Sequence, residues 1–166
     1  MAKQLGAQHL IFHHGYVPFT TSANWVKSSV QRSVLFFDEF LSMRGTSMAI
    51  HIENVFDWDP TFLVDLIDGV AKPFVDANLD IGHVNCFAKT SIIEWINCLG
   101  NRIGYVHLHD NHGTSDEHLG LGKGKIPLEE ALAALSANAP DAFWAIEADG
   151  DGRQESIDWL AAKGFL

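Results

Sequence analysis

The stretch Ile103-Gly104-Tyr105-Val106-His107-Leu108-His109-Asp110-Asn111 decides how the rest of the chain is interpreted. An apolar run ends abruptly in histidine and aspartate, and a loop rich in Gly, His and Asp follows. In a chain of alternating strands and helices, this pattern is typical of a buried parallel strand whose carboxyl end carries chemistry. Because strand side chains alternate, His107 and His109 face away from Val106 and Leu108. A histidine at the mouth of such a strand is a natural metal ligand.

Four other segments have a similar form, and helical patterns separate them. The predicted strands span residues 9–12, 48–52, 74–81, 103–108 and 143–146. Between them, apolar residues recur every three or four positions, as in amphipathic helices. The first helix is predicted over residues 24–43, with Ser22 as its N-cap and Gly45 as its stop, and Ser91 starts a later one. Alternating strands and helices without a linker predict one α/β domain over residues 1–166, with parallel strands and right-handed crossovers.

Two architectures fit this order of elements. One is an open doubly wound sheet, and the other is part of an eight-stranded barrel. A dinucleotide site of the Rossmann kind is disfavoured, because its Gly-x-Gly-x-x-Gly fingerprint directly follows a strand. Here Gly120, Gly122 and Gly124 lie one residue apart in a loop, far from any predicted strand end.

The charge and hydropathy of the chain narrow the classes of partner. The 166 residues carry a formal net charge of -10, which disfavours a broad surface for nucleic acid or anionic membranes. No apolar run approaches the ~20 residues of a membrane span, and no signal core is present at the N-terminus. We therefore expect a soluble, cytoplasmic protein.

Each predicted strand ends in a side chain that can bind a metal. These residues are His13, Glu53, Asp80, His107 and Glu147. The carboxyl ends of parallel strands converge on one face of the fold, where sites are built. A mixed carboxylate and imidazole set without thiolates suits a divalent metal. From the residues alone, Mn, Zn, Mg and Fe(II) fit equally.

At this point the chain resembles the xylose-isomerase-like TIM barrels, a superfamily that includes sugar isomerases and epimerases and endonuclease IV. The matching motifs, in order, are His13-x-Gly15, Glu53-Asn54, Asp80-x-x-His83, His107-Leu-x-Asp110, Asp116-x-His118 with Gly122-x-Gly124, and Glu147. The ordered set covers nearly all of the chain. The resemblance implies a partial (β/α)8 barrel of about five parallel strand–helix units.

The resemblance also implies roles for particular residues. Glu53, Asp80, His107 and Glu147 would share one divalent metal, and Glu53 and Glu147 would move a proton at the carbon beside a carbonyl. With the family resemblance, Mn or Zn is the metal expected first, and Mg, Co or Fe after them. His83 would contact substrate oxygens. The implied function is a metal-dependent isomerase or epimerase acting on a small-molecule sugar or sugar phosphate. Trp58 is a further candidate for stacking on a sugar ring, and Lys123 for binding a phosphate.

An endonuclease IV-like zinc phosphodiesterase is the main alternative. His83, Asp116 and His118 match the third zinc site of that enzyme, and His13 with Glu53 matches part of its first. These four positions, His13, His83, Asp116 and His118, are therefore candidates for a second metal or for substrate. From strand register alone, His109 could also take the place of His107 as a ligand. A non-catalytic half-barrel is the third possibility.

The chain is shorter than a complete barrel of this kind. A complete barrel of this kind has eight strands and roughly 250 residues, and three N-terminal strands have no counterpart here. Five strands cannot reproduce the tilt and stagger of an eight-stranded closure. We therefore expect uncovered sheet edges, and either self-association or completion by an N-terminal partner segment.

Overall fold

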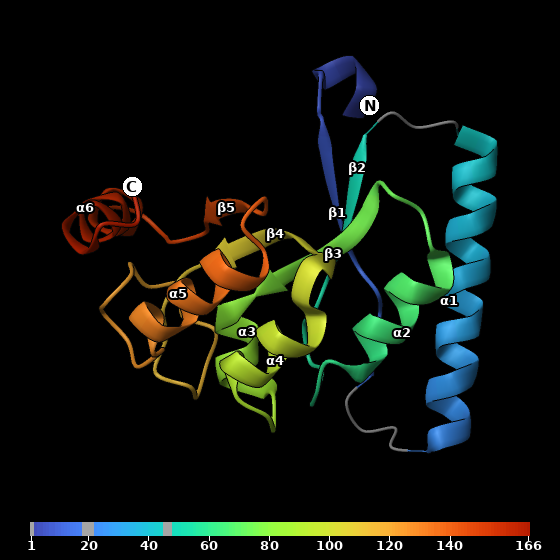
Figure 1. Ribbon diagram of the computed structural model, residues 1–166, viewed down its shortest axis with the longest axis horizontal. Helices are drawn as coiled ribbons and strands as arrows, with labels where there is room; N and C mark the ends of the chain where they lie inside the picture. The colour runs from blue at the N-terminus through green and yellow to red at the C-terminus, as the bar shows by residue number, and fades with distance from the viewer. Residues whose placement is uncertain (1, 18–21, 45–47) are drawn as a thin grey trace.

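The computed structural model describes residues 2–17, 22–44 and 48–166 and contains one curved parallel sheet (Figure 1). The strands follow chain order, β1-β2-β3-β4-β5, and all four pairings are parallel. Their bounds are β1 (His9–His13), β2 (Ala49–Glu53), β3 (Val75–Asp80), β4 (Ile103–Leu108) and β5 (Phe143–Ile146). This order and direction confirm the prediction of a partial barrel of five strand–helix units.

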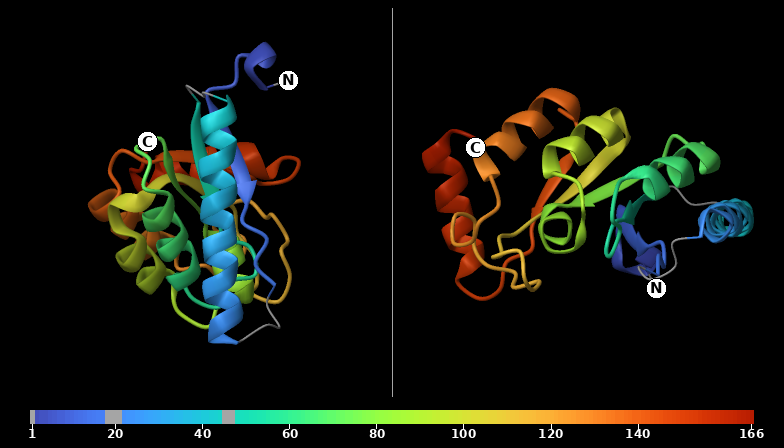
Figure 2. Two further views of the ribbon diagram at one scale, coloured as in Figure 1. Left: turned by 90° about the vertical axis from the view of Figure 1, so that its right-hand side faces the viewer. Right: turned by 90° about the horizontal axis from the view of Figure 1, so that it is seen from below.

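The first five helices lie between successive strands and the last follows β5, and together they cover one face of the sheet. They are α1 (Ala23–Arg44), α2 (Thr61–Val70), α3 (Ile81–Phe87), α4 (Ile92–Leu99), α5 (Leu128–Asn138) and α6 (Gly152–Lys163), with short 3-10 turns at Ala2–Leu5 and Gly100–Arg102. Viewed from below in Figure 2, α2, α4 and α5 lie on the outer side of the curve, with α1 and α6 at its two ends. The opposite, concave face of the sheet is the inside of a half-barrel.

Strand alternation divides the sheet into an apolar and a polar face. Ile50 and Ile52 of β2 are completely buried against the helices, together with Leu79, Val106 and Leu108 of the neighbouring strands. On the helix side, the core contains Leu63, Leu66, Trp95, Ile96, Leu99 and Leu132, all 0% exposed. Full burial of side chains of this size stabilises a fold by about 1.5–3 kcal/mol each.

The concave face instead carries polar side chains, even deep inside the curve. His51 and Glu53 alternate with the two isoleucines of β2 and point to this face. Near the amino ends of the strands, the Nδ1 of His9 lies 2.8 Å from the Nε2 of His51. The other ring nitrogen of His51, Nδ1, is hydrogen-bonded to the Asp76 carboxylate. The polar face continues from there to the carboxyl ends of the strands, where the predicted ligands lie.

The structure confirms one predicted helix start and corrects the predicted end of the third strand. Ser91 caps α4 with a capping box that pairs it with Glu94. Residues 74–81 were predicted as one strand, but Ile81 begins the seven-residue helix α3. Asp80 ends the strand because its side chain accepts a hydrogen bond from the His83 N–H and so caps that helix. The predicted stop at Gly45 lies outside the described residues. Among the described residues, no helix is both long and apolar enough to cross a membrane.

Both outer strands keep an unpaired edge within the described residues, since β1 pairs only with β2 and β5 only with β4. Ile11 and Phe143 on these strands are 37% and 58% exposed, and alternation places them on the concave face. Exposed strand edges beside apolar side chains favour association. We predict that light scattering at micromolar concentration gives a mass of at least two chains.

The double variant Ile11→Lys, Phe143→Lys should lower the mass measured by light scattering, because it places charge on the face that associates. Leu35→Lys on α1 is the matched control, because Leu35 is 67% exposed and belongs to a helix. A monodisperse monomer of the unmodified chain would show that the open edges do not associate.

Candidate metal centre

Four potential ligands meet at the carboxyl ends of four neighbouring strands. Glu53 ends β2, Asp80 ends β3, His107 lies in β4 and Glu147 follows β5. One side-chain ligand atom from each lies within 4.8 Å of the others. The Nδ1 of His107 is 2.9 Å from a Glu147 oxygen, 3.3 Å from a Glu53 oxygen and 3.6 Å from an Asp80 oxygen. The structure therefore brings together the four side chains that the sequence proposes as ligands.

The three neighbouring carboxylates set the pKa of His107. Burial alone lowers the pKa of His107, but hydrogen bonds to Asp80, Glu147 and Glu53 outweigh burial and raise that pKa to about 12. Burial alone raises the pKa of Asp80, but His107 and His109 hold it far below its usual range. The His107 imidazolium thus supplies positive charge that the clustered carboxylates require.

This donor set fits a divalent cation. Three carboxylates and one imidazole are ligands that Mn and Zn accept. Such an ion at the meeting point of the four side chains would supply two positive charges and leave His107 neutral. The cluster therefore suits a divalent metal by charge as well as by proximity.

Asn54 ties the ends of β2 and β3 together. Its Nδ2 donates to the Asp80 carbonyl at 3.0 Å, and its Oδ1 accepts from the Asp80 N–H at 2.9 Å. Its own carbonyl accepts from His83 Nδ1 at 2.9 Å. Because Asn54 directly follows Glu53, this buried clamp fixes the spacing of two of the four ligands. An amide beside a candidate ligand was the only signal of this role in the sequence.

A second group lies next to the first and consists of His109, Asp116 and His118, whose ligand atoms also lie within 4.8 Å of one another. The rings of His109 and His118 stack with centroids 4.2 Å apart. Asp116 Oδ2 is 3.0 Å from His118 Nε2 and 3.2 Å from His83 Nε2. Within the described chain, two buried atoms of this group, His109 Nδ1 and Asp116 Oδ1, lack a hydrogen-bond partner.

His109 enters this second group where the sequence motif placed His83. His83 lies between the groups, because its Nδ1 is 3.5 Å from both Glu53 and Asp80 while its Nε2 faces Asp116. His109 approaches Asp80 at 3.1 Å, and His107 alone of the pair contacts Glu53 and Glu147. Of the two histidines that the sequence left open, His107 therefore belongs to the first group and His109 does not.

The loop that delivers Asp116 and His118 is anchored by Asp110. One carboxylate oxygen of Asp110 accepts from Asn111 N–H at 2.9 Å and Ile126 N–H at 3.2 Å, and the other from Gly122 at 3.1 Å and Gly124 at 2.8 Å. A Cβ on Gly124 would lie 2.3 Å from the Asn111 carbonyl oxygen, so this close approach requires glycine.

His118 completes the loop in a strained backbone conformation. Its φ is +49°, a backbone angle that residues other than glycine rarely adopt. The conformation is held because its Nδ1 donates to the Glu147 carbonyl at 2.7 Å, while its own carbonyl accepts from Asp149 N–H at 2.9 Å. Strain of this kind persists where surrounding contacts over-determine a functional geometry.

Three other predicted site residues have different surroundings. The Nε2 of His13 is 3.5 Å from Glu53, but the His13 side chain is 64% exposed. Lys123 pairs with Glu155 of α6 at 3.3 Å. Trp58 lies beside α2, where the Lys89 ammonium is 3.1 Å from the centre of its ring. Of the three, His13 alone has a described contact with the first group, so substrate roles for Trp58 and Lys123 remain predictions without a contact to support them.

A family model described as xylose isomerase-like TIM barrel matches residues 1–163. The chain therefore belongs to the xylose isomerase-like TIM barrel family, which confirms the resemblance seen in its motifs. Two uncharacterized proteins of Methanocaldococcus jannaschii are each 28% identical to it. The first match covers 88% of this chain and 52% of the relative, and the second covers 76% and 49%. The chain thus spans about half the length of the curated relatives it matches.

Solved structures with this fold include sugar epimerases. A D-tagatose 3-epimerase-like protein superposes with a TM-score of 0.81 at 25% identity, over 99% of this chain and 64% of that one. A Thermus thermophilus protein soaked with zinc chloride superposes with a TM-score of 0.80 at 20% identity, with the same coverage. The second likeness concerns the fold alone.

We predict that Asp110→Asn loosens the loop that carries the second group. Replacing one carboxylate oxygen by an amide leaves backbone N–H groups without an acceptor, which should lower the free energy of unfolding by about 3 kcal/mol. Urea unfolding measures this loss, and amide exchange at Gly122 and Gly124 should accelerate. Asp141→Asn in an exposed turn is the control and should change stability by less than about 0.5 kcal/mol. Equal stability of both variants would contradict the anchoring role.

Proposed function

We propose that this protein is a divalent-metal-dependent sugar isomerase or epimerase that moves a proton next to a carbonyl. The observation that carries the proposal is the convergence of three carboxylates and one imidazole at the mouth of the half-barrel. In parallel α/β barrels, active sites are built at this end of the strands. Epimerases among the structural neighbours support the reaction class.

Glu53, Asp80, His107 and Glu147 would hold the metal. A bound divalent ion supplies a Lewis acid that polarises the substrate carbonyl. The donor set favours Mn or Zn, with Mg, Co and Fe as other candidates. Asn54 and the helix cap at Asp80 hold two of these side chains in place, so little reorganisation is needed when they bind an ion.

Glu53 and Glu147 are suited to pass the proton because their surroundings differ. The Glu53 side chain is buried, 5% exposed, and lies near His13, His83 and His107. The Glu147 side chain is 43% exposed, and its hydrogen bond to His107 lowers its pKa. They project from strands at different positions around the curve, so a sugar between them would present a different face to each carboxylate. One can remove a proton while the other returns it.

His83 is placed to bind a substrate hydroxyl or carbonyl oxygen. Its ring is oriented by the Asn54 carbonyl through Nδ1. Burial lowers the pKa of His83, but the nearby carboxylates, Asp80 first, together with the hydrogen bond to Asn54 outweigh burial and raise that pKa. Neighbouring structures include a D-allulose 3-epimerase with D-allulose and a D-psicose 3-epimerase with D-tagatose. Ketoses are therefore the first substrates to test.

A phosphodiesterase is the second candidate function, and the second group favours it. His109, Asp116 and His118 could hold another metal, and two of their buried atoms lack partners in the described chain. Adjacent metals would clamp the oxygens of a phosphodiester. Metal stoichiometry distinguishes the functions: one ion per chain supports the epimerase, whereas two or three zinc ions, with one lost in Asp116→Asn, support the hydrolase.

We predict that the chain binds one divalent ion through the first group. His107→Ala and Asp80→Asn should each weaken binding by about 100-fold or more, since even outer partners of a ligand are worth about 10–100-fold. Mass spectrometry of the metal retained after dialysis against Mn or Zn measures this. Glu155→Gln is the control, because this exposed residue of α6 belongs to neither group of potential ligands. Undiminished metal in both ligand variants would exclude this site.

We further predict that the metal-loaded protein exchanges the proton beside the carbonyl of a ketohexose with solvent. In deuterium oxide, proton NMR should show loss of the signal from the carbon next to the carbonyl. Glu53→Gln and Glu147→Gln should each slow this exchange by about 100-fold or more, the usual contribution of a general acid or base. Glu130→Gln on the exposed side of α5 should exchange at the unmodified rate. Exchange that survives in both glutamate variants would refute their role.

A further inference from the structure

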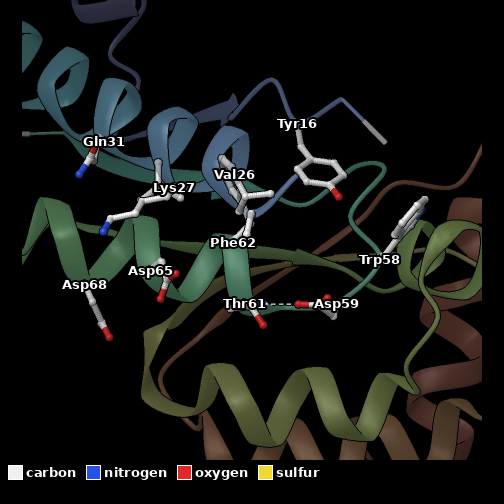
Figure 3. Close-up of a pocket in the computed structure, with 12 residues that line it drawn as sticks. Tyr16, Val26, Lys27, Gln31, Trp58, Asp59, Thr61, Phe62, Asp65 and Asp68 are labelled. Atoms are coloured by element: carbon white, nitrogen blue, oxygen red, sulfur yellow. Dashed lines mark hydrogen bonds between the residues drawn. The ribbon is translucent and has the colours of Figure 1, made fainter. Parts of the chain in front are cut away.

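A cavity of about 640 Å³ lies between the first two helices, away from the metal centre. Figure 3 shows it opening between α1 and α2, with the segment after β1 and the segment before α2 at one end. None of its 12 lining residues belongs to either group of potential metal ligands. Cavities of ~300–1,000 Å³ are of the size that binds small molecules.

One end of the cavity is aromatic. Its walls there come from Tyr16, Trp58 and Phe62, and Val26 and Val30 of α1 extend the apolar surface. The rings of Tyr16 and Phe62 pack edge to face, 5.5 Å apart, and Phe62 rests on His14 at 4.7 Å. His14 is itself fixed by a 3.0 Å contact with Asp57. These contacts hold the aromatic wall in place.

The rim of the cavity carries more negative than positive charge. Asp59, Asp65 and Asp68 line it, against one lysine, Lys27. Asp68 is neutralised by Arg102 through bonds of 2.6 and 2.8 Å. Among described residues, no ion pair engages Asp65 or Lys27, and Asp59 accepts only the Thr61 N–H at 2.9 Å, a bond that Figure 3 shows as a dashed line.

The negative field reaches the aromatic end. Burial raises the pKa of the Tyr16 hydroxyl, and the charges of Asp57 and Asp59 raise it further. The Lys89 ammonium already covers one face of the Trp58 ring at 3.1 Å, which leaves the Tyr16 and Phe62 rings as the aromatic faces for a further cation. Anions would meet repulsion at this rim, whereas a cation would be attracted both by the carboxylates and by the ring faces.

We propose that this cavity binds a small organic cation with an apolar body, of the alkylammonium class. The aromatic wall receives the apolar body, and Asp59 and Asp65 offset the charge. Aromatic faces combined with carboxylates are the means by which proteins recognise quaternary ammonium groups. This site is separate from the proposed metal-dependent reaction and needs no metal.

Choline and its uncharged isostere 3,3-dimethylbutan-1-ol are the probes. Both have the same shape and hydroxyl group, so their difference in affinity measures the charge alone. The titrations are done with EDTA present and followed by isothermal calorimetry and by the indole NMR signal of Trp58. Choline should bind about tenfold more tightly than the isostere, as expected for partly desolvated cation–aromatic and carboxylate contacts.

The double variant Asp59→Asn, Asp65→Asn should remove about tenfold of the choline affinity and leave the isostere unchanged. It keeps the acceptor oxygen for Thr61, and its melting temperature should match that of the unmodified protein. Asp141→Asn, with a charge removed far from the cavity, should retain full affinity. Equal binding of the two probes, no binding of either, or an equal loss in Asp141→Asn would overturn the proposal.

Discussion

The candidate site depends on a constraint of parallel strands, namely that their side chains alternate while their carboxyl ends lie at the same edge. In β2, Ile50 and Ile52 enter the core while His51 and Glu53 face the inside of the curve. In β3 the same alternation turns Asp80 to this face, two residues beyond Asn78, which is the register partner of Glu53. Asp80 in turn pairs with His107 of β4. A shift of one residue in any pairing would send a ligand into the apolar core and an apolar side chain into the site. The buried core and the cluster of candidate ligands therefore require the same register.

Three buried or partly buried carboxylates at one point repel each other, and the surrounding chain holds them there. Asn54 bonds both backbone groups of Asp80, and the cap of α3 occupies one Asp80 oxygen. The carboxylates raise the pKa of His107, and its protonated ring offsets part of their negative charge. A second set of contacts, centred on Asp110, holds the loop that carries Asp116 and His118. The site is thus preorganised by hydrogen bonds to backbone groups, and a cation would complete its charge balance.

Much of the fold could be predicted because its signals are local. The strand over residues 103–108 and the strand over 143–146 have the predicted bounds, and Ser91 starts α4 as predicted. The helix after Asp80 was missed because seven residues are too few to show a helical period, and its start depends on one side-chain cap. Trp58 follows Glu53 closely in sequence, yet the loop carries it to the cavity beside α2. A loop has no period from which the direction of a side chain can be predicted.

By itself, the sequence determined the parallel strand–helix order and the polar strand ends, since these follow from residue type and spacing. Only the tertiary structure decided that His109 joins Asp116 and His118, that His83 lies between the two groups, and that Asn54 and Asp110 hold them in place. The physical reason is that these contacts join residues far apart in the chain. Their distances are set by strand pairing across the sheet and by the path of a long loop, and neither leaves a periodic signal in the sequence.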